Sequence, residues 1–78
     1  MNESGVMGIG DRVRWARLRA VMTTRQLSEK TGVSAPTLGR IERGRTDARA
    51  GDMAKISRAL DVSDAWLTFG RGAWKVSS

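Results

Sequence analysis

Residues 24–44 read TRQLSEKTGVSAPTLGRIERG, and they hold two short helical patterns separated by a tight turn. Thr23 is a good N-cap for the first helix, and Gln26 three residues later completes a capping box. Gly32 follows where the C-terminus of a helix favours a residue with positive φ. Ser34 is placed to cap the second helix. Two helices joined by such a turn predict a helix-turn-helix motif.

The second of these helices is predicted to have one buried face and one outward, basic face. Leu38 and Ile41 have the spacing of inward residues, and Gly44 is expected to end the helix. The residues that remain on the outward face are Ala35, Pro36, Thr37, Gly39, Arg40 and Arg43. Small residues let the backbone approach a surface closely, and an arginine one turn later can reach O6 and N7 of guanine. The face therefore predicts DNA recognition; the alternative is a helical hairpin whose arginines are only solvated.

Composition narrows the class of protein. The chain has 78 residues, enough for one domain, with no cysteine and no histidine. Disulfides, the usual zinc sites and catalysis by cysteine or histidine are therefore excluded. Ser34, Ser57 and Ser63 already have capping or packing explanations. We accordingly expect no enzymatic activity, no metal, no cofactor and no small-molecule ligand.

Charge points to the partner. The formal net charge is +6, and eleven of the fourteen basic residues are arginine, which suits phosphate and base-edge recognition. Such a balance favours a polyanionic partner. No apolar run approaches membrane-spanning length, and residues 1–8 lack the features of a signal peptide. We expect no membrane contact and a cytoplasmic location, at the bacterial nucleoid.

Three further helices are expected around the motif. The first covers residues 9–22, with Val13, Ala16 and Ala20 facing inward. Trp15 lies off this inward stripe, so it either packs under arginine side chains or belongs to a partner surface. The fourth helix covers residues 50–60, and its inward positions are Met53, Ile56, Ser57 and Leu60.

The fifth helix and the two ends complete the division of the chain. The fifth helix is expected over residues 64–69, capped by Ser63 and ended by Gly70. Residues 1–8 are predicted to form a flexible N-terminal arm, residues 9–70 the domain, and residues 71–78 a C-terminal tail. In the tail, Trp74 and Val76 alternate with polar residues in a weak strand-like pattern. They predict a contact, either with a second copy or with the body of the same protomer.

The order of four motifs identifies a family resemblance. RVRWARLR, MTTRQLSEKTGVS, TLGRIERGR and ISRALDVSDAWL follow one another within residues 10–70. This segment resembles the DNA-binding domain of the phage repressor and Cro proteins, the lambda-repressor-like, Cro/C1-type (xenobiotic-response-element) helix-turn-helix family. The resemblance implies a compact all-α domain of five helices. Helices two and three would form the motif, and helix three would enter the major groove.

The resemblance also assigns roles to individual residues. It implies that bases are read by Ala35, Pro36, Thr37 and Arg40. It implies that the DNA backbone is contacted by Thr24, Arg25, Arg43, Arg45 and Arg49. Thr24 stands where the family usually has a glutamine, so it can donate one hydrogen bond without bracing the next helix. For the loop of residues 45–49, a plain solvated connection is the alternative to a backbone contact.

Two structural roles follow from the same resemblance. Arg17 and Glu42 match a pair of the family that links the first helix to the end of the reading helix. The dimer surface in the family is built around the fifth helix and the segment after it. The candidates here are Trp66, Leu67, Phe69 and Trp74, although the same residues could instead close the core.

The functional expectation is a sequence-specific, double-stranded DNA-binding transcriptional regulator without chemistry of its own. More specifically, we expect a repressor of a phage or mobile-element switch that binds a palindromic, inverted-repeat operator as a homodimer. The alternative is an antitoxin or anti-repressor that uses the same fold to hold a partner protein, for which Trp15 and Trp74 would provide the surface.

Overall fold

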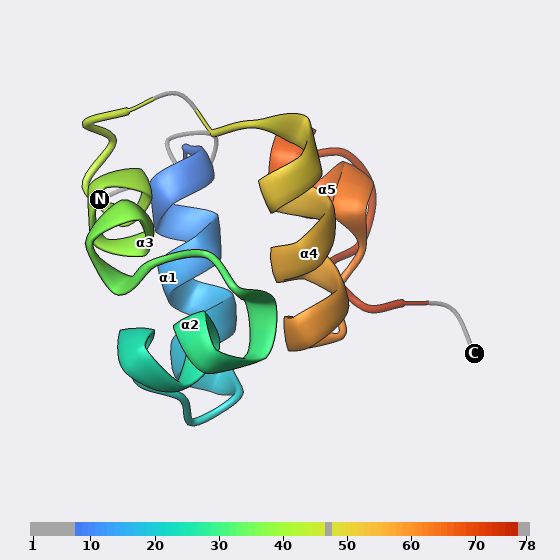
Figure 1. The fold of residues 1–78 in the computed structure, drawn as a ribbon. Helices are drawn as coiled ribbons and strands as arrows, with labels where there is room; N and C mark the ends of the chain where they lie inside the picture. Colours follow the sequence, from blue (N-terminus) through green and yellow to red (C-terminus); the bar gives the residue numbers. More distant parts are fainter. Residues whose placement is uncertain (1–7, 47, 77–78) are drawn as a thin grey trace.

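The computed structural model describes residues 8–46 and 48–76, and it arranges them as five helices (Figure 1). The helices are α1 (Ile9–Arg19), α2 (Thr24–Thr31), α3 (Ala35–Glu42), α4 (Ala50–Leu60) and α5 (Asp64–Phe69). α1 contacts α3, α4 and α5, whereas α2 packs between α3 and α4. The five-helix, all-α fold predicted from the sequence is therefore confirmed.

Local signals in the sequence fix where the helices of the motif begin and end. The Thr23 Oγ1 accepts a hydrogen bond from the Gln26 backbone N–H at 3.0 Å, and the Gln26 Oε1 accepts one from the Thr23 N–H at 2.9 Å. This is the expected capping box, which satisfies two N–H groups that the helix leaves unpaired. Gly32 ends α2 with φ of 80°. The Ser34 Oγ then caps α3 by accepting from the Thr37 N–H at 3.3 Å.

One hydrophobic core holds the helices together, and every helix contributes to it. Its buried apolar residues are Val13, Ala16, Leu27, Val33, Leu38, Ile41, Met53, Ile56, Leu60, Val62 and Leu67. The expected inward residues of α3 and α4 are all buried. Ser57 is the buried polar residue among them, and its hydroxyl donates to the Ala54 carbonyl at 3.0 Å. The outward face of α3 is therefore not part of the hydrophobic core.

The first helix is shorter than the sequence predicted. It ends at Arg19 rather than at residue 22, because Val21 adopts a left-handed conformation with φ of 57°. This conformation turns the chain so that the Met22 N–H bonds back to the Arg17 carbonyl at 3.1 Å. The Val21 side chain points to solvent and is 86% exposed. A β-branched residue is strained in this region, so the turn carries a conformational cost.

Three tryptophans from α1, α5 and the segment after α5 form a cluster. The Trp15 ring meets the rings of Trp66 and Trp74 edge to face, with centroids 5.5 Å and 5.4 Å apart. The Arg19 guanidinium lies 4.2 Å from the Trp74 ring centre, within cation–π range. The sequence allowed Trp15 either to pack under arginine side chains or to belong to a partner surface. In the structure, Trp15 packs on aromatic rings of its own chain.

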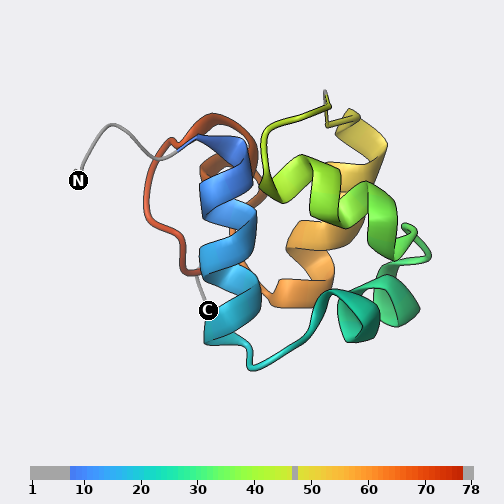
Figure 2. The same cartoon turned by 90° about the vertical axis from the view of Figure 1, so that its left-hand side faces the viewer.

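The segment after α5 folds back onto the domain. Figure 2 shows it (red) running alongside α1 (blue). The Trp74 carbonyl accepts a hydrogen bond from the Ser63 N–H at 2.8 Å, and Val62 and Lys75 form an isolated antiparallel bridge. The weak strand-like pattern of the tail therefore corresponds to a contact with the body of the same protomer. Except for Gly8, the predicted N-terminal arm lies outside the described residues, as do the last two residues of the tail.

Among the helices that the structure describes, none combines the length and the apolar character needed to cross a membrane.

The strain at Val21 generates a stability prediction. Replacing Val21 with glycine should stabilise the fold by about 1 kcal/mol. The free energy gained by removing the unfavourable φ is larger than the free-energy cost of the higher conformational entropy that glycine gives the unfolded chain. The midpoint of urea unfolding would measure this. Val21→Ala, which keeps the Cβ and therefore the strain, is the matched control. An equal gain in the control would attribute the effect to the exposed side chain instead of the backbone.

Candidate nucleic-acid interface

α3 is packed on one side and free on the other. Leu38 is fully buried and Ile41 is 2% exposed, and both face the core. On the opposite face, Pro36, Arg40 and Arg43 are exposed. The four positions to which the resemblance assigns base reading therefore lie on one short helix, although the structure leaves Ala35 and Thr37 only partly exposed.

A chain of hydrogen bonds runs along this outward face. The Ser34 Oγ donates to the Thr37 Oγ1 at 2.8 Å, and the Arg40 Nη2 donates to the same oxygen at 3.4 Å. Arg40 thus leans back toward the N-terminal end of α3, as helical side chains do. The Thr37 hydroxyl, which accepts both bonds, still has a proton to donate to an acceptor outside the protein.

The residues expected on the DNA backbone lie at the start of α2 and after α3. Thr24 is the first residue of α2, and Arg25 follows it with an exposed ion pair to Glu29 at 4.0 Å. Such a pair contributes little, so Arg25 stays available. Arg45 and Arg49 are exposed in the connection between α3 and α4. Side chains of this kind suit phosphate contacts, which position a protein on a duplex without reading sequence.

The ion pair expected between Arg17 and Glu42 is present and two-pronged. The Arg17 Nε and Nη2 donate to the two Glu42 carboxylate oxygens at 2.7 Å and 2.9 Å. The side chains are only 12% and 7% exposed. The hydrogen bonds that Arg17 donates to Glu42 raise the pKa of Arg17 above its ordinary value, against the opposing effect of burial. Arg17 also donates to the Met22 carbonyl at 2.8 Å, so one guanidinium ties α3 and the turn before α2 to α1.

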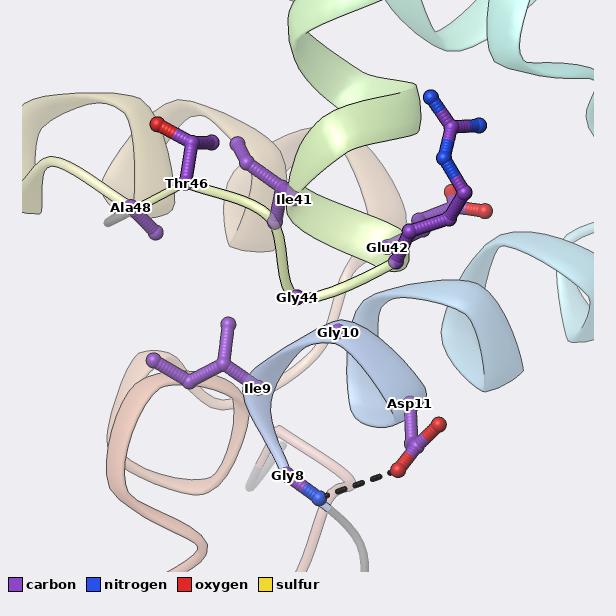
Figure 3. Close-up of a pocket in the computed structure, with 10 residues that line it drawn as sticks. Gly8, Ile9, Gly10, Asp11, Ile41, Glu42, Gly44, Thr46 and Ala48 are labelled. Carbon is purple, nitrogen blue, oxygen red and sulfur yellow. Dashed lines mark hydrogen bonds between the residues drawn. The ribbon is translucent and has the colours of Figure 1, made fainter.

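A second contact between α1 and α3 depends on the absence of a side chain. A Cβ built on Gly10 would lie 2.5 Å from the carbonyl oxygens of both Ile41 and Glu42, closer than real atoms approach. Figure 3 shows Gly10 at this crossing, beside a pocket between the start of α1 and the end of α3. Gly10 and Arg17 therefore hold the end of α3 at two points along α1.

Arg12 has a structural role that the sequence did not reveal. Its Nε and Nη2 donate to the carbonyls of Leu67 and Thr68 at 3.0 Å and 3.2 Å, near the end of α5. Desolvation by burial lowers the pKa of Arg12, and the charge of Asp11 partly offsets this. Sequence periodicity placed Arg12 on the outer surface of its helix, and no motif in the chain signals a guanidinium that caps another helix.

The expected dimer residues separate into three groups. Phe69 is 69% exposed and suits a contact surface. Trp66 and Trp74 are half-buried in the tryptophan cluster. Leu67 is fully buried and belongs to the core. For Leu67 the structure fits the alternative left open by the sequence, that the residue closes the core, because it lies on the inward face of α5.

Five helices, with a basic outward face on the second helix of a helix-turn-helix, define a DNA-binding domain of the repressor type. The chain belongs to the helix-turn-helix family whose model matches residues 13–67. It is 42% identical over 54 residues to an uncharacterized HTH-type transcriptional regulator of Mycobacterium tuberculosis. That match covers 69% of this chain and 39% of the relative, so the chain spans well under half of the relative's length.

Solved structures with similar folds include a repressor and a DNA-binding domain. One is the P22 c2 repressor in complex with a synthetic operator, with a TM-score of 0.78 and 26% identity over 85% of this chain and all of that chain. Another is the N-terminal DNA-binding domain of SinR from Bacillus subtilis, with a TM-score of 0.73 and 33% identity over 76% of this chain and 87% of that domain. The predicted repressor-type resemblance is confirmed, and the family supports a DNA-binding regulator.

The close approach at Gly10 predicts a large effect from one methyl group. Gly10→Ala should destabilise the fold by about 2 kcal/mol, because α1 and α3 must separate to admit the Cβ. Gly51→Ala is the control, since Gly51 lies in α4 with no atom near its Cβ position. Thermal unfolding of both variants would measure the difference. An unaltered melting temperature for Gly10→Ala would contradict the tight crossing.

The ion pair predicts a loss of both stability and DNA affinity. Arg17→Ala should cost about 3 kcal/mol of unfolding free energy, because Glu42 would remain buried without its partner. Adding Glu42→Gln should recover part of that loss. Arg14→Ala, at an exposed position of the same helix, is the control. Chemical unfolding measures the loss of stability, and titration with duplex DNA measures the loss of affinity. If Arg17→Ala unfolded like the unchanged chain, the pair would not hold α3 in place.

Proposed function

We propose that this chain binds double-stranded DNA in a sequence-specific manner, with α3 in the major groove, and represses transcription from a phage or mobile-element promoter. The observation that carries this proposal is an α3 whose inward face is locked by Ile41, Leu38 and the Arg17–Glu42 pair while its outward face is free. A reading helix needs both properties, because base contacts require a fixed orientation.

Specificity and affinity would come from different residues. Thr37 and Arg40 provide hydrogen-bonding groups for base edges, whereas Ala35 and Pro36 offer only apolar contact, which suits a thymine methyl. Thr24, Arg25, Arg45 and Arg49 would bond phosphates. Loss of such contacts weakens binding to all sequences and reduces its dependence on salt.

The proposed active species is a homodimer on an inverted repeat. Phe69 supports this, since it is a large apolar side chain left 69% exposed at the end of α5. The Arg71 guanidinium lies 5.8 Å from its ring centre, which adds a polar rim to the apolar surface. Two copies related by a two-fold axis would place their reading helices in successive major grooves, about one helical turn of DNA apart.

A second candidate function is a protein-interaction module of the antitoxin or anti-repressor kind. Leu18 and Val21 favour it, because they lie near the end of α1 and are 52% and 86% exposed. Trp15 and Trp74, which suggested this alternative in the sequence, pack against each other instead. Co-purification of a second protein in equal amount, together with a lack of selective DNA binding, would favour this function.

The experiment that tests the proposal is selection of duplexes from a random pool by the unchanged chain, by Arg40→Ala and by the control Arg14→Ala. We expect an inverted repeat from the unchanged chain and from the control. Arg40→Ala should relax the preference at one position of each half-site by about 1–3 kcal/mol, measured on single-base variants of the selected duplex. If all three chains bound DNA without enriching any sequence, sequence-specific binding by this chain would be excluded.

A further inference from the structure

Gly39 lies in the middle of α3, where glycine is an unfavourable choice. Glycine stabilises a helix interior less than alanine does. Gly39 does not adopt the positive φ that would require a glycine, as Gly32 and Gly44 do. Outside the backbone of α3 itself, the three atoms nearest to the position of its missing Cβ belong to a side chain. Neither the backbone conformation nor a tight helix crossing therefore explains this residue.

The neighbour of Gly39 is the guanidinium of Arg43. Arg43 Nη1, Nη2 and Cζ lie 3.3 Å, 3.5 Å and 3.7 Å from the Cβ position of Gly39. The guanidinium therefore rests on the helix one turn before its own residue. A Cβ at position 39 would press on the Arg43 guanidinium and shift it by a few tenths of an ångström, and a longer side chain would compete for the same part of the helix surface.

Helical spacing puts Gly39, on which this guanidinium rests, within the outward stripe of α3. Pro36, Gly39, Arg40 and Arg43 follow one another at i, i+3, i+4 and i+7, which forms a single stripe. Leu38 and Ile41 lie buried on the other side of α3. Arg43 is the C-cap of α3, and a side chain directed beyond the helix end would reach a flanking phosphate. Instead it leans back over Gly39, beside the residues proposed to meet bases.

We propose that Gly39 is a specificity-determining position of α3, because its missing side chain lets the Arg43 guanidinium lie on the reading face and contact base edges beside Arg40. This inference rests on the proposed function. It gives Arg43 a role different from the phosphate contact expected from the family resemblance.

The chemistry of this contact is the two-pronged donation of an arginine to O6 and N7 of guanine. Ala35 and Pro36, on the N-terminal half of the face, have no side-chain hydrogen-bonding groups. Two arginines on one stripe therefore imply two guanine contacts in each half-site, one from Arg40 and one from Arg43. Gly39 is a positioning residue for the second of these contacts.

A double-mutant cycle tests the inference. The chains compared are the unchanged chain, Gly39→Ala, Arg43→Ala and the double variant, with Gly51→Ala as the matched control for a helical glycine with open surroundings. Each is titrated with the duplex that the unchanged chain selects from a random pool and with every single-base variant of one half-site. Melting temperatures are recorded alongside, to show that each chain is folded.

We expect Gly39→Ala to melt at or above the temperature of the unchanged chain and to bind the selected duplex about tenfold more weakly, the size of one lost base contact. Arg43→Ala should lose a similar factor, with relaxed preference at the same guanine. The double variant should bind no more weakly than Arg43→Ala. Gly51→Ala should bind as the unchanged chain does.

Three results would overturn the inference. Equal losses from Gly39→Ala with and without Arg43 would show that Gly39 acts through its own close approach to DNA. A uniform loss on all sequences from Arg43→Ala, with a smaller salt dependence, would show a phosphate contact. An unchanged affinity of Gly39→Ala would show no role at all. In each case selective binding by the unchanged chain would leave the proposed function intact, whereas absence of selective binding would remove both.

Discussion

The bidentate pair between Arg17 and Glu42 is the interaction on which the placement of α3, the proposed reading helix, depends. α3 has eight residues, too few for a helix that is stable by itself. Leu38 and Ile41 hold its inward face by apolar contact, which resists separation more than rotation. The pair adds direction, because two parallel hydrogen bonds of 2.7 Å and 2.9 Å fix the end of α3 relative to α1. The orientation of the outward face is therefore fixed, in addition to the contact of α3 with the core.

Gly10 makes this pair possible. Arg17 reaches Glu42 only if the start of α1 lies against the last carbonyls of α3, and a Cβ at position 10 would prevent that approach. One glycine and one arginine, two helical turns apart on α1, thus act on the same short stretch of α3. The cost of burying two charges is offset by geometry: each Glu42 oxygen accepts a hydrogen bond, and the remaining Arg17 nitrogen donates to the Met22 carbonyl.

Much of the fold could be predicted from the sequence because its helix boundaries are marked by residues with local causes. Ser63 and Gly70 bracket α5 as expected, and the capping box of Thr23 and Gln26 starts α2. The end of α1 was misplaced because valine gives no signal for a left-handed conformation. The positive φ at Val21 lets the Met22 side chain pack against the core, and this tertiary contact is not encoded by any local sequence preference.

The candidate site divides in the same way. Helical periodicity shows which residues of α3 face outward, since Leu38 and Ile41 mark the inward side. Periodicity cannot show which way a long side chain bends. For three arginines, this direction decides which groups the guanidinium contacts. Arg12 turns to the carbonyls of Leu67 and Thr68, Arg19 covers Trp74, and Arg43 folds over Gly39. The pair of Arg17 with Glu42 could be predicted only from the family resemblance, because two residues 25 positions apart in the sequence give no local signal that they are in contact.

These side-chain directions change the meaning of the net charge. The formal charge of +6 counts every arginine equally, but Arg17 is neutralised by Glu42 and Arg12 is partly buried against carbonyls. Arg12 and Arg17 of α1 thus serve the packing of the domain, whereas Arg25, Arg40, Arg43, Arg45 and Arg49 remain exposed between the start of α2 and the start of α4. Arg14, Arg19, Arg58 and Arg71 are exposed as well, so the exposed positive charge is shared between the motif and the rest of the domain. Arginine therefore has two uses in this small domain: Arg12 and Arg17 hold helices together, and the arginines of the motif stay exposed.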